Sequence, residues 1–418
     1  MVTHVRASDL RAVARLATAA ALGTTRIVEG VHQSVWRTLG APGGQPPDRT
    51  RGLTGLVYRC VNGLTQSLGT GLDSVLTRLE PLLGAMDAEP PNSPQRLAVV
   101  AALNGVIGDR LLADGSPLAL PMTLQHNGKT LDTAKPPPAS DMGGKILLLV
   151  HGLCMNDLQW QTWRKAADGS LQPGLDHGQA LAQAQGFTPL YLRYNTGRHV
   201  SDNGRDLSAL LQRLLACWPV PVQELVVVAH SMGGLVTRSA LHQATTSNQD
   251  WPARLTRIVF LGTPHHGAPL ERAGNWVDRL LGGTPWSAPF ARLAQLRSSG
   301  ITDLRHGHLI EGDRSGRDRF LHHVDTRQPL PLPGRVACLA VAATLAGRRS
   351  LVAERLLGDG LVPLRSALGQ HDEAARTLAF GPHDRLIVYR TGHLQLLSAA
   401  AVGRAVGDWL ASGRAQQP

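Results

Sequence analysis

One serine of this chain lies in a sequence suited to nucleophilic chemistry. The run 226–234, Val-Val-Val-Ala-His-Ser-Met-Gly-Gly, passes from β-branched residues through Ser231 into a segment, 235–243, that is compatible with a helix. A serine in such a sharp strand-to-helix turn has a strained backbone that exposes its hydroxyl, and only small residues fit two positions before and after it. Ala229 and Gly233 fill these positions, although glycine is usual at the first. The pattern predicts that Ser231 is a catalytic nucleophile.

A nucleophilic serine needs a general base and an acid that orients this base. On a sheet of this kind the chain order is serine, acid, histidine, with the acid and the histidine each in a loop after a later strand. Asp359 lies between two glycines beyond the expected strand 336–342, and His393 follows the expected strand 386–390. We therefore expect Asp359 to orient His393, and His393 to act first as a base and then as an acid.

Rival residues fit these roles less well. His230 is expected to point away from the neighbouring hydroxyl, and His265 and His266 come too early in the chain order. Cys154 is an alternative nucleophile, but no acid–base pair is arranged around it in the sequence. The other carboxylates near expected loops are Asp157, Asp313, Asp318 and Asp384.

An oxyanion that forms on the substrate needs two backbone donors. The amide of Met232, directly after the serine, is expected to supply one. The apolar strand 145–150 ends in His151, Gly152 and Leu153, where glycine lets the backbone turn its amides toward the nucleophile. The sequence therefore predicts that the amide of Leu153 is the second donor.

Strand and helix signals alternate along the part of the chain that carries these residues. Continuous apolar runs predict strands at 145–150, 191–194, 225–229, 257–262, 336–342 and 386–390. Helical patterns cover 97–112, 207–217 and 393–410, and Asn127-Gly128 predicts a β-hairpin over 118–131. Such alternation predicts an α/β fold with a mostly parallel sheet and helices on both faces.

The rest of the chain divides into a helical start and one insertion. Residues 1–95 have apolar residues at helical spacing and end in a proline-rich break, so we expect a helical region there and a catalytic domain over 96–418. An insertion over about 268–333 contains Trp276, Trp286 and Phe290. These large apolar groups are expected to line an acyl pocket under a lid, or else to pack the insertion's own small core.

The chain resembles serine α/β-hydrolases of the lipase/esterase group, and in particular bacterial lipase-like and GPI inositol-deacylase (PGAP-type) proteins. The motifs that carry this resemblance are His151-Gly152-Leu153, Tyr194-Asn195-Thr196-Gly197, Ala229 to Gly234, Leu261 to Gly267, Asp359 to Pro363 and Gly392-His393-Leu394. The resemblance implies an α/β-hydrolase fold, the triad, an acyl-ester substrate, and neither a metal nor an organic cofactor. It does not cover residues 1–95, and the membrane spans of eukaryotic deacylases are lacking, so that specific activity is not carried over.

Charge and composition indicate which classes of partner to expect. The net charge of +11 comes almost entirely from arginines that are spread along the chain, and aromatic residues make up only 4%, whereas nucleic-acid-binding proteins cluster basic residues around aromatic ones. We therefore expect no nucleic acid partner, and we attribute the charge to a compositional bias, with attraction to anionic lipid or an acidic substrate as the alternative. The four cysteines are far apart, and no apolar run is long enough for a membrane span, which favours a cytoplasmic protein.

Three functions are compatible with these patterns. The leading hypothesis is a serine esterase or lipase that cleaves small-molecule or lipid-like carboxylic esters. An acyltransferase would use the same triad and pass the acyl group to an alcohol or amine. The third is a non-catalytic binding protein on a hydrolase fold, whose helical region 1–95 contacts a membrane or inclusion surface; such peripheral contact is also compatible with the enzyme.

Overall fold

The computed structural model describes residues 94–133, 135, 138–161, 163–165, 171–173, 175–268, 298–314, 327–347 and 358–412. The chain divides into two units, residues 1–96 with 115–118 and residues 97–114 with 119–418. The sheet lies in the second unit. The predicted helical region 1–95 lies outside the described residues apart from its last two, and stays a prediction.

Eight strands of the described residues form one sheet in the order β10-β9-β8-β7-β3-β6-β1-β2. The six from β10 to β6 are parallel, whereas β1 is antiparallel to both of its neighbours. The strands are β1 (Thr123–His126), β2 (Lys129–Thr130), β3 (Lys145–Val150), β6 (Thr188–Arg193), β7 (Glu224–His230), β8 (Leu255–Leu261), β9 (Ala337–Thr344) and β10 (Arg385–Tyr389). A separate hairpin pairs β4 (Trp163–Lys165) with β5 (Leu171–Pro173).

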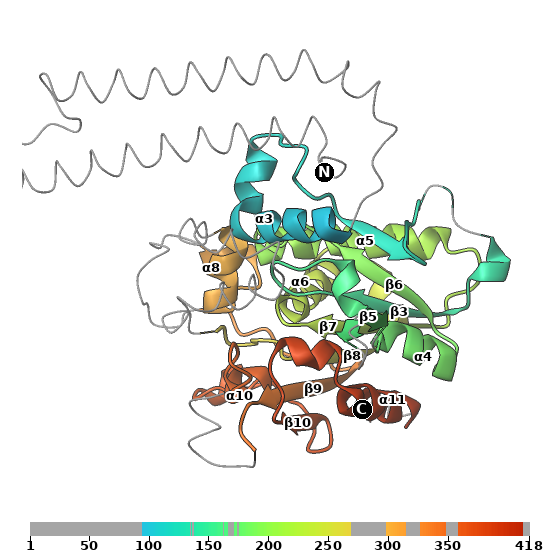
Figure 1. Cartoon of the computed structure of the whole chain (residues 1–418). Coiled ribbons are helices and arrows are strands. Elements are labelled where there is room, and N and C mark those ends of the chain that lie inside the picture. The colour runs from blue at the N-terminus through green and yellow to red at the C-terminus, as the bar shows by residue number, and fades with distance from the viewer. Residues whose placement is uncertain are drawn as a thin grey trace, which may run out of the picture. The chain divides into compact units, whose positions relative to one another are not determined.

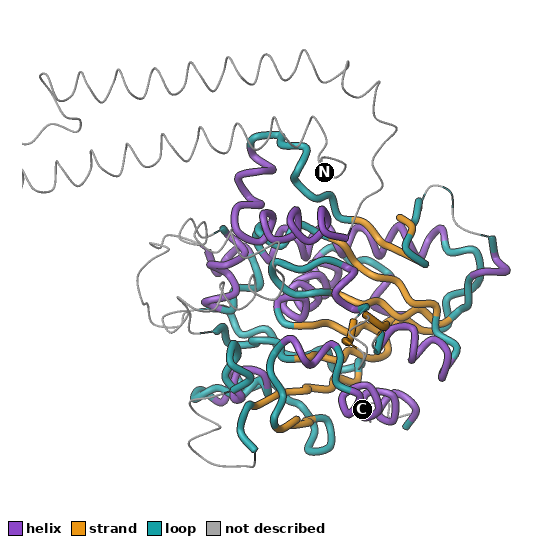
Figure 2. The backbone as a smooth tube through the Cα atoms, viewed as in Figure 1, coloured by secondary structure: helices purple, strands orange, loops and turns teal. Residues whose placement is uncertain are grey.

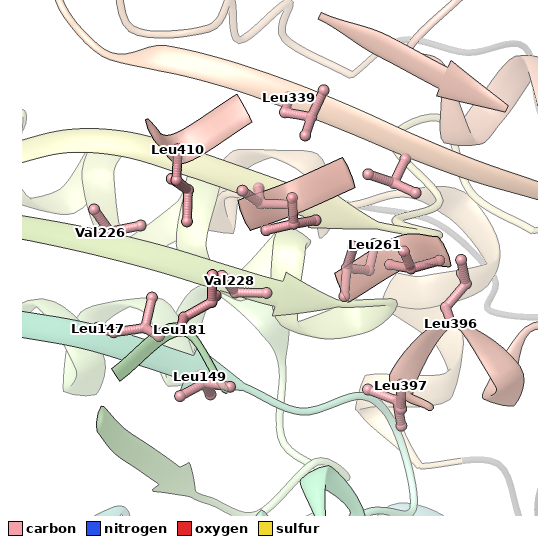
Figure 3. Packing of buried hydrophobic residues seen from close by; sticks show 14 of the residues in the cluster. Leu147, Leu149, Leu181, Val226, Val228, Leu261, Leu339, Leu396, Leu397 and Leu410 are labelled. Carbon is pink, nitrogen blue, oxygen red and sulfur yellow. The ribbon is translucent and has the colours of Figure 1, made fainter. Parts of the chain in front are cut away.

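One face of the sheet packs against α4 (His177–Gln185) and α11 (Ala400–Ala411), as Figure 1 shows. Side chains alternate between the two faces along a strand, so every second apolar residue of β3 and β7 reaches this helical layer. Figure 3 shows these side chains in the buried cluster, among them Leu147, Leu149, Val226 and Val228. The strands read as continuous apolar runs because helices cover both faces.

The helices α5 (Val200–Cys217) and α6 (Met232–Thr246) cover the opposite face, so the strands pass between two helical layers in Figure 2. These two helices approach closely at Gly204, where a Cβ atom would lie 2.3 Å from Oγ of Ser239. The helix α6 also contacts β7 and β3. It begins at Met232, directly after β7 ends at His230 and the turn at Ser231, and thus at the edge of the sheet where the parallel strands end.

Most of the predicted elements are confirmed. Each of the six predicted strands corresponds to an observed one, from β3 to β10, with ends that differ by up to three residues. The predicted hairpin turn is present, and φ is +49° at Asn127 and +74° at Gly128, as a type I′ turn requires. The predicted helix 97–112 is α3 (Pro94–Ala113), with non-helical dihedral angles at Ile107.

Three predictions about local structure need correction, and one helix was not predicted. The helix predicted at 207–217 begins at Val200, and the first hairpin strand begins at Thr123 rather than at 118. The helix predicted over 393–410 is a 3-10 turn (Leu394–Leu397) followed by α11, because Ala399 between them has an extended backbone. The sequence reading missed α4, whose alanines and glutamines give a weak apolar pattern. Its capping residues Asp176 and Gly186 were the available signal.

Strand order, crossover helices and the strand–turn–helix at Ser231 define an α/β-hydrolase fold. In the described parts of the insertion 268–333 the chain forms α8 (Ser299–His306) and a 3-10 turn (Glu311–Arg314). Among the described residues there is no helix with the length and apolarity to cross a membrane.

Candidate active site

The backbone at Ser231 has the strain expected of a nucleophile turn. Its dihedral angles are φ +54° and ψ −125°, a region that residues with a side chain rarely occupy. A Cβ atom at position 233 would lie 2.5 Å from the Val150 carbonyl oxygen and 2.7 Å from that of His151, so only glycine fits there. The predicted need for a small residue at Gly233 is therefore a direct consequence of the contact between α6 and the end of β3.

Asp359 and His393 form a buried pair. Nδ1 of His393 lies 2.7 Å from Oδ2 of Asp359, and the two residues are 4% and 3% exposed. A carboxylate only accepts hydrogen bonds, so Nδ1 carries the proton and Nε2 of the neutral ring is left as a proton acceptor. This is the tautomer that a general base beside a serine requires.

The loop around Asp359 fixes the direction of its carboxylate. Oδ1 accepts hydrogen bonds from the amides of Leu361 (2.9 Å) and Val362 (2.7 Å), which leaves Oδ2 for His393. Gly358 has φ +44°, and a Cβ atom there would lie 2.1 Å from the Val362 carbonyl oxygen. The glycine before the acid is thus required by the tight turn that aims it.

Ser231 and His393 each lie next to the end of β8. The amide of Ser231 donates to the Leu261 carbonyl at 2.8 Å. At the next residue, Gly262, a Cβ atom would lie 3.1 Å from both Cε1 and Nδ1 of His393. Within the described residues no hydrogen bond joins Oγ of Ser231 to His393, and such bonds in serine hydrolases are often long before substrate binds.

The loop after β3 lies against the serine. A Cβ atom at Gly152 would be 2.9 Å from Cβ of Ser231, so this glycine allows the two segments to touch. The amide of Leu153 donates to no acceptor in the described part of the chain, and the amide of Met232 stands in the first turn of α6, where a helix supplies no acceptor. The two predicted oxyanion donors are therefore both available on segments that flank the serine.

The end of β6 supports this loop, a role that the sequence analysis did not assign. Oη of Tyr194 donates to the His151 carbonyl at 2.9 Å, and the two rings stack with centroids 4.5 Å apart. Oγ1 of Thr196 accepts a hydrogen bond from the amide of Cys154 at 3.1 Å. The only sequence signal for this role was the motif Tyr194-Asn195-Thr196-Gly197, which is one of the motifs that carry the family resemblance.

His230 packs beneath the candidate base. As expected, it does not serve the hydroxyl of its neighbour: its Nε2 donates to the His393 carbonyl at 3.2 Å, and the two rings lie 4.7 Å apart. Burial, and then the neighbouring His393, lower the pKa of His230 well below its usual value, so this ring is neutral. Burial also lowers the pKa of His151, to about 4.

The rival carboxylates are engaged elsewhere. Asp157 binds Arg193 through two bonds of 2.6 and 3.0 Å, which anchors the loop after β3. Asp384 accepts from Nε1 of Trp409 at 2.8 Å, and Asp313 accepts from the amides of the loop at 309–310. Asp318 lies outside the described residues.

Cys154 is poorly suited to be a nucleophile. Burial raises the pKa of its thiol to about 12, so at neutral pH it is protonated and unreactive. The predicted acyl-pocket residues Trp276, Trp286 and Phe290 lie outside the described residues. Among the residues that are described, no group of three His, Cys, Asp or Glu side chains is arranged to hold a metal ion.

Comparison with known proteins adds a family model and several solved structures. Residues 120–300 match a model described as a domain of unknown function (DUF7379). No curated protein matches the chain. The chain is similar to the mature lipase BlEst2 of Bacillus licheniformis at 17% identity and TM-score 0.39, with 69% of this chain and 97% of that chain covered.

Two further solved structures are similar at comparable levels. For Aspergillus fumigatus lipase B the identity is 12% and the TM-score 0.41, and 71% of this chain and 57% of that chain are covered. For an esterase of Pyrobaculum calidifontis the identity is 13% and the TM-score 0.35, with 64% and 75% covered. The α/β-hydrolase class of this protein rests on its own strand order and on the turn at Ser231.

Proposed function

We propose that this protein is a serine hydrolase that cleaves carboxylic esters through an acyl-enzyme on Ser231. The observation that carries the proposal is the buried hydrogen bond from Nδ1 of His393 to Asp359, 2.7 Å long, beside Gly262 and the strained serine turn. A binding protein has no use for a strained serine next to a histidine whose tautomer is fixed by a buried carboxylate.

In this mechanism Oγ of Ser231 attacks the ester carbonyl while Nε2 of His393 takes its proton. The amides of Leu153 and Met232 donate to the oxygen that becomes negative, and fixed donors of this kind stabilise the transition state by about 3–4 kcal/mol each. His393 then gives the proton to the leaving alcohol. Water attacks the acyl-enzyme by the same route in reverse, which releases the acid and restores the serine.

The substrate proposed is a small-molecule or lipid-like acyl ester. The resemblance to bacterial lipase-like and PGAP-type proteins supports an acyl ester, and Trp276, Trp286 and Phe290 are proposed to line the acyl pocket. Each buried methylene of an acyl chain would contribute about 0.8 kcal/mol to binding. Contact of residues 1–95 with a membrane or inclusion surface, and a cytoplasmic location, remain part of this proposal.

Active-site labelling tests the proposal. A fluorophosphonate should modify wild-type protein at Ser231, and p-nitrophenyl esters should be hydrolysed. Both signals should vanish in Ser231→Ala and survive in Cys154→Ala, which is the matched control for the alternative nucleophile. Folded wild-type protein that neither reacts with the probe nor turns over any ester would overturn the enzyme assignment.

Product analysis separates hydrolysis from acyl transfer. With an added acceptor alcohol, a hydrolase gives mainly free acid, whereas an acyltransferase gives mainly the new ester, because both react from the same acyl-enzyme. We expect free acid at every acceptor concentration. No observation on the described residues favours transfer.

A further inference from the structure

A small cavity lies beside α6, away from the triad residues. Its wall includes Arg238 from α6, His265 and His266 from the turn after β8, Asp313, Arg327 and Arg376. Its volume is about 20 Å³. A cavity needs about 10–15 Å³ to hold one water molecule, so there is room for a single small species.

Arg238 is a buried cation to which no carboxylate of the described residues is bonded. The residue is 6% exposed; Nη1 contacts Nδ1 of His265 at 3.4 Å, and Nη2 donates to the Leu330 carbonyl. Nε has no hydrogen-bond partner, and among the described residues no carboxylate oxygen is bonded to this guanidinium. Burying a charge without a counter-charge is costly, so such a group in a native protein usually has an ion beside it.

His265 leaves a second donor without an acceptor. Because Nδ1 accepts from Arg238, the neutral ring carries its proton on Nε2, and this buried nitrogen has no partner. Burial, and then the charge of Arg238, lower the pKa of His265 well below its usual value, so the ring is neutral. Two buried donors of wall residues, Nε of Arg238 and Nε2 of His265, therefore lack an acceptor.

The charge of the wall is positive. Among the described residues three arginines and the carboxylate of Asp313 line the cavity, and one of the arginines, Arg376, is paired with Glu373 at 2.8 Å. Both oxygens of Asp313 are occupied by backbone amides, those of Leu309 and Ile310 on Oδ2 and that of Gln328 on Oδ1. Burial and the nearby Arg327 lower the pKa of Arg238 to about 10, which still leaves it charged at neutral pH.

We propose that this cavity binds one small anion, of the size of chloride, as the counter-ion of Arg238. The cavity is too small for a bulky organic anion, and its wall joins segments that are far apart in sequence, among them α6, the turn after β8, and 327–330. Arg238 follows Ser231 by seven residues on α6, about 10 Å along the helix. The bound anion would thus brace the helix that begins at the nucleophile.

Thermal unfolding in matched salts tests this. At constant ionic strength, replacing sodium gluconate by sodium chloride or bromide should raise Tm by about 2–5 °C, and the rise should saturate, as expected for one site that binds only the folded state. A rise without saturation, or an equal Tm in gluconate, would mean that the salts act only through screening or exclusion from the surface. Either result would overturn the site.

Variants and a direct measurement complete the test. Arg238→Met should abolish the dependence of Tm on chloride, and Arg327→Met should shift it to higher chloride concentration, whereas Arg213→Met, an exposed position on α5, should leave it unchanged. If Arg238→Met does not fold, crystals of the wild-type protein grown in bromide still decide: anomalous signal beside Arg238 supports the site. Density for water alone there overturns it.

Discussion

Nδ1 of His393 donates to Oδ2 of Asp359 across 2.7 Å, in a pair that is almost fully removed from solvent. The other oxygen of Asp359 is held by two backbone amides, so the carboxylate has one free acceptor and His393 has one allowed tautomer. The assignment of Asp359 as the acid can therefore be tested by replacing one carboxylate oxygen with an NH₂ group.

Asp359→Asn should leave the fold nearly intact and lower turnover by a factor of about 10⁴. The amide oxygen can still accept from Leu361 and Val362, but its NH₂ group then faces Nδ1 and forces the proton of His393 onto Nε2. Ester kinetics and a thermal melt measure the two effects. Asp384→Asn, whose carboxylate accepts from Trp409 instead, is the control and should keep near-normal turnover. If the control collapses and Asp359→Asn does not, the acid has been assigned to the wrong loop.

The strain at Ser231 predicts that a variant which relieves it gains stability and loses activity. Dihedral angles of φ +54° and ψ −125° suit glycine, and holding a residue with a Cβ atom there costs about 1–3 kcal/mol. Ser231→Gly should relieve this strain, and part of the resulting gain in stability is offset by the extra conformational freedom of glycine in the unfolded chain. We therefore expect Ser231→Gly to be about 1 kcal/mol more stable than Ser231→Ala, with both inactive. Urea unfolding checks this, and an alanine variant as stable as the glycine one would contradict it.

Gly152 is predicted to control the oxyanion loop. A methyl group there would lie 2.9 Å from Cβ of Ser231 and 3.1 Å from Nδ1 of His230, so Gly152→Ala must displace the loop that carries the amide of Leu153. Loss of one oxyanion donor typically lowers kcat by a factor of about 10²–10³. Gly334→Ala is the matched control, since a Cβ atom there meets nothing within 4 Å. Equal kcat values for the two variants would exclude this role.

Stability should fall as the pH drops below about 6.5. Burial lowers the pKa of His151 to about 4, whereas in the unfolded chain it is about 6.5, so between these values the unfolded state binds more protons. The contribution of His151 to the free energy of unfolding is therefore fully present above about pH 6.5. It decreases toward pH 4 by up to about 3 kcal/mol. His230, His265 and His266 act in the same direction.

The variant His151→Gln isolates one of these contributions. Its free energy of unfolding, measured in urea across this pH range, should depend less steeply on pH than that of the wild type, by up to one proton. A slope identical to that of the wild type would show that His151 is not a neutral buried group.

Local geometry was predictable wherever the backbone conformation allows only certain residue types. The turn at Asn127-Gly128 and the small residue at Gly233 follow from positive φ angles or close approach, and the sheet strands follow from apolar runs buried on both faces. The helix α4 was not predicted because its buried residues are His177, Gly178 and a single leucine, Leu181, which give no clear apolar period.

The sequence by itself determined the class of fold, the strained serine turn and the order in which the candidate acid and base follow. Only the tertiary structure decided which atoms meet. Oδ2 rather than Oδ1 of Asp359 contacts His393, Tyr194 and Thr196 bond to the oxyanion loop, and buried Arg238 donates to the Leu330 carbonyl. The first set depends on dihedral angles and alternation, which neighbouring residues specify. The second depends on strand order and on the direction of each side chain in a packed interior, which segments far apart in sequence fix together.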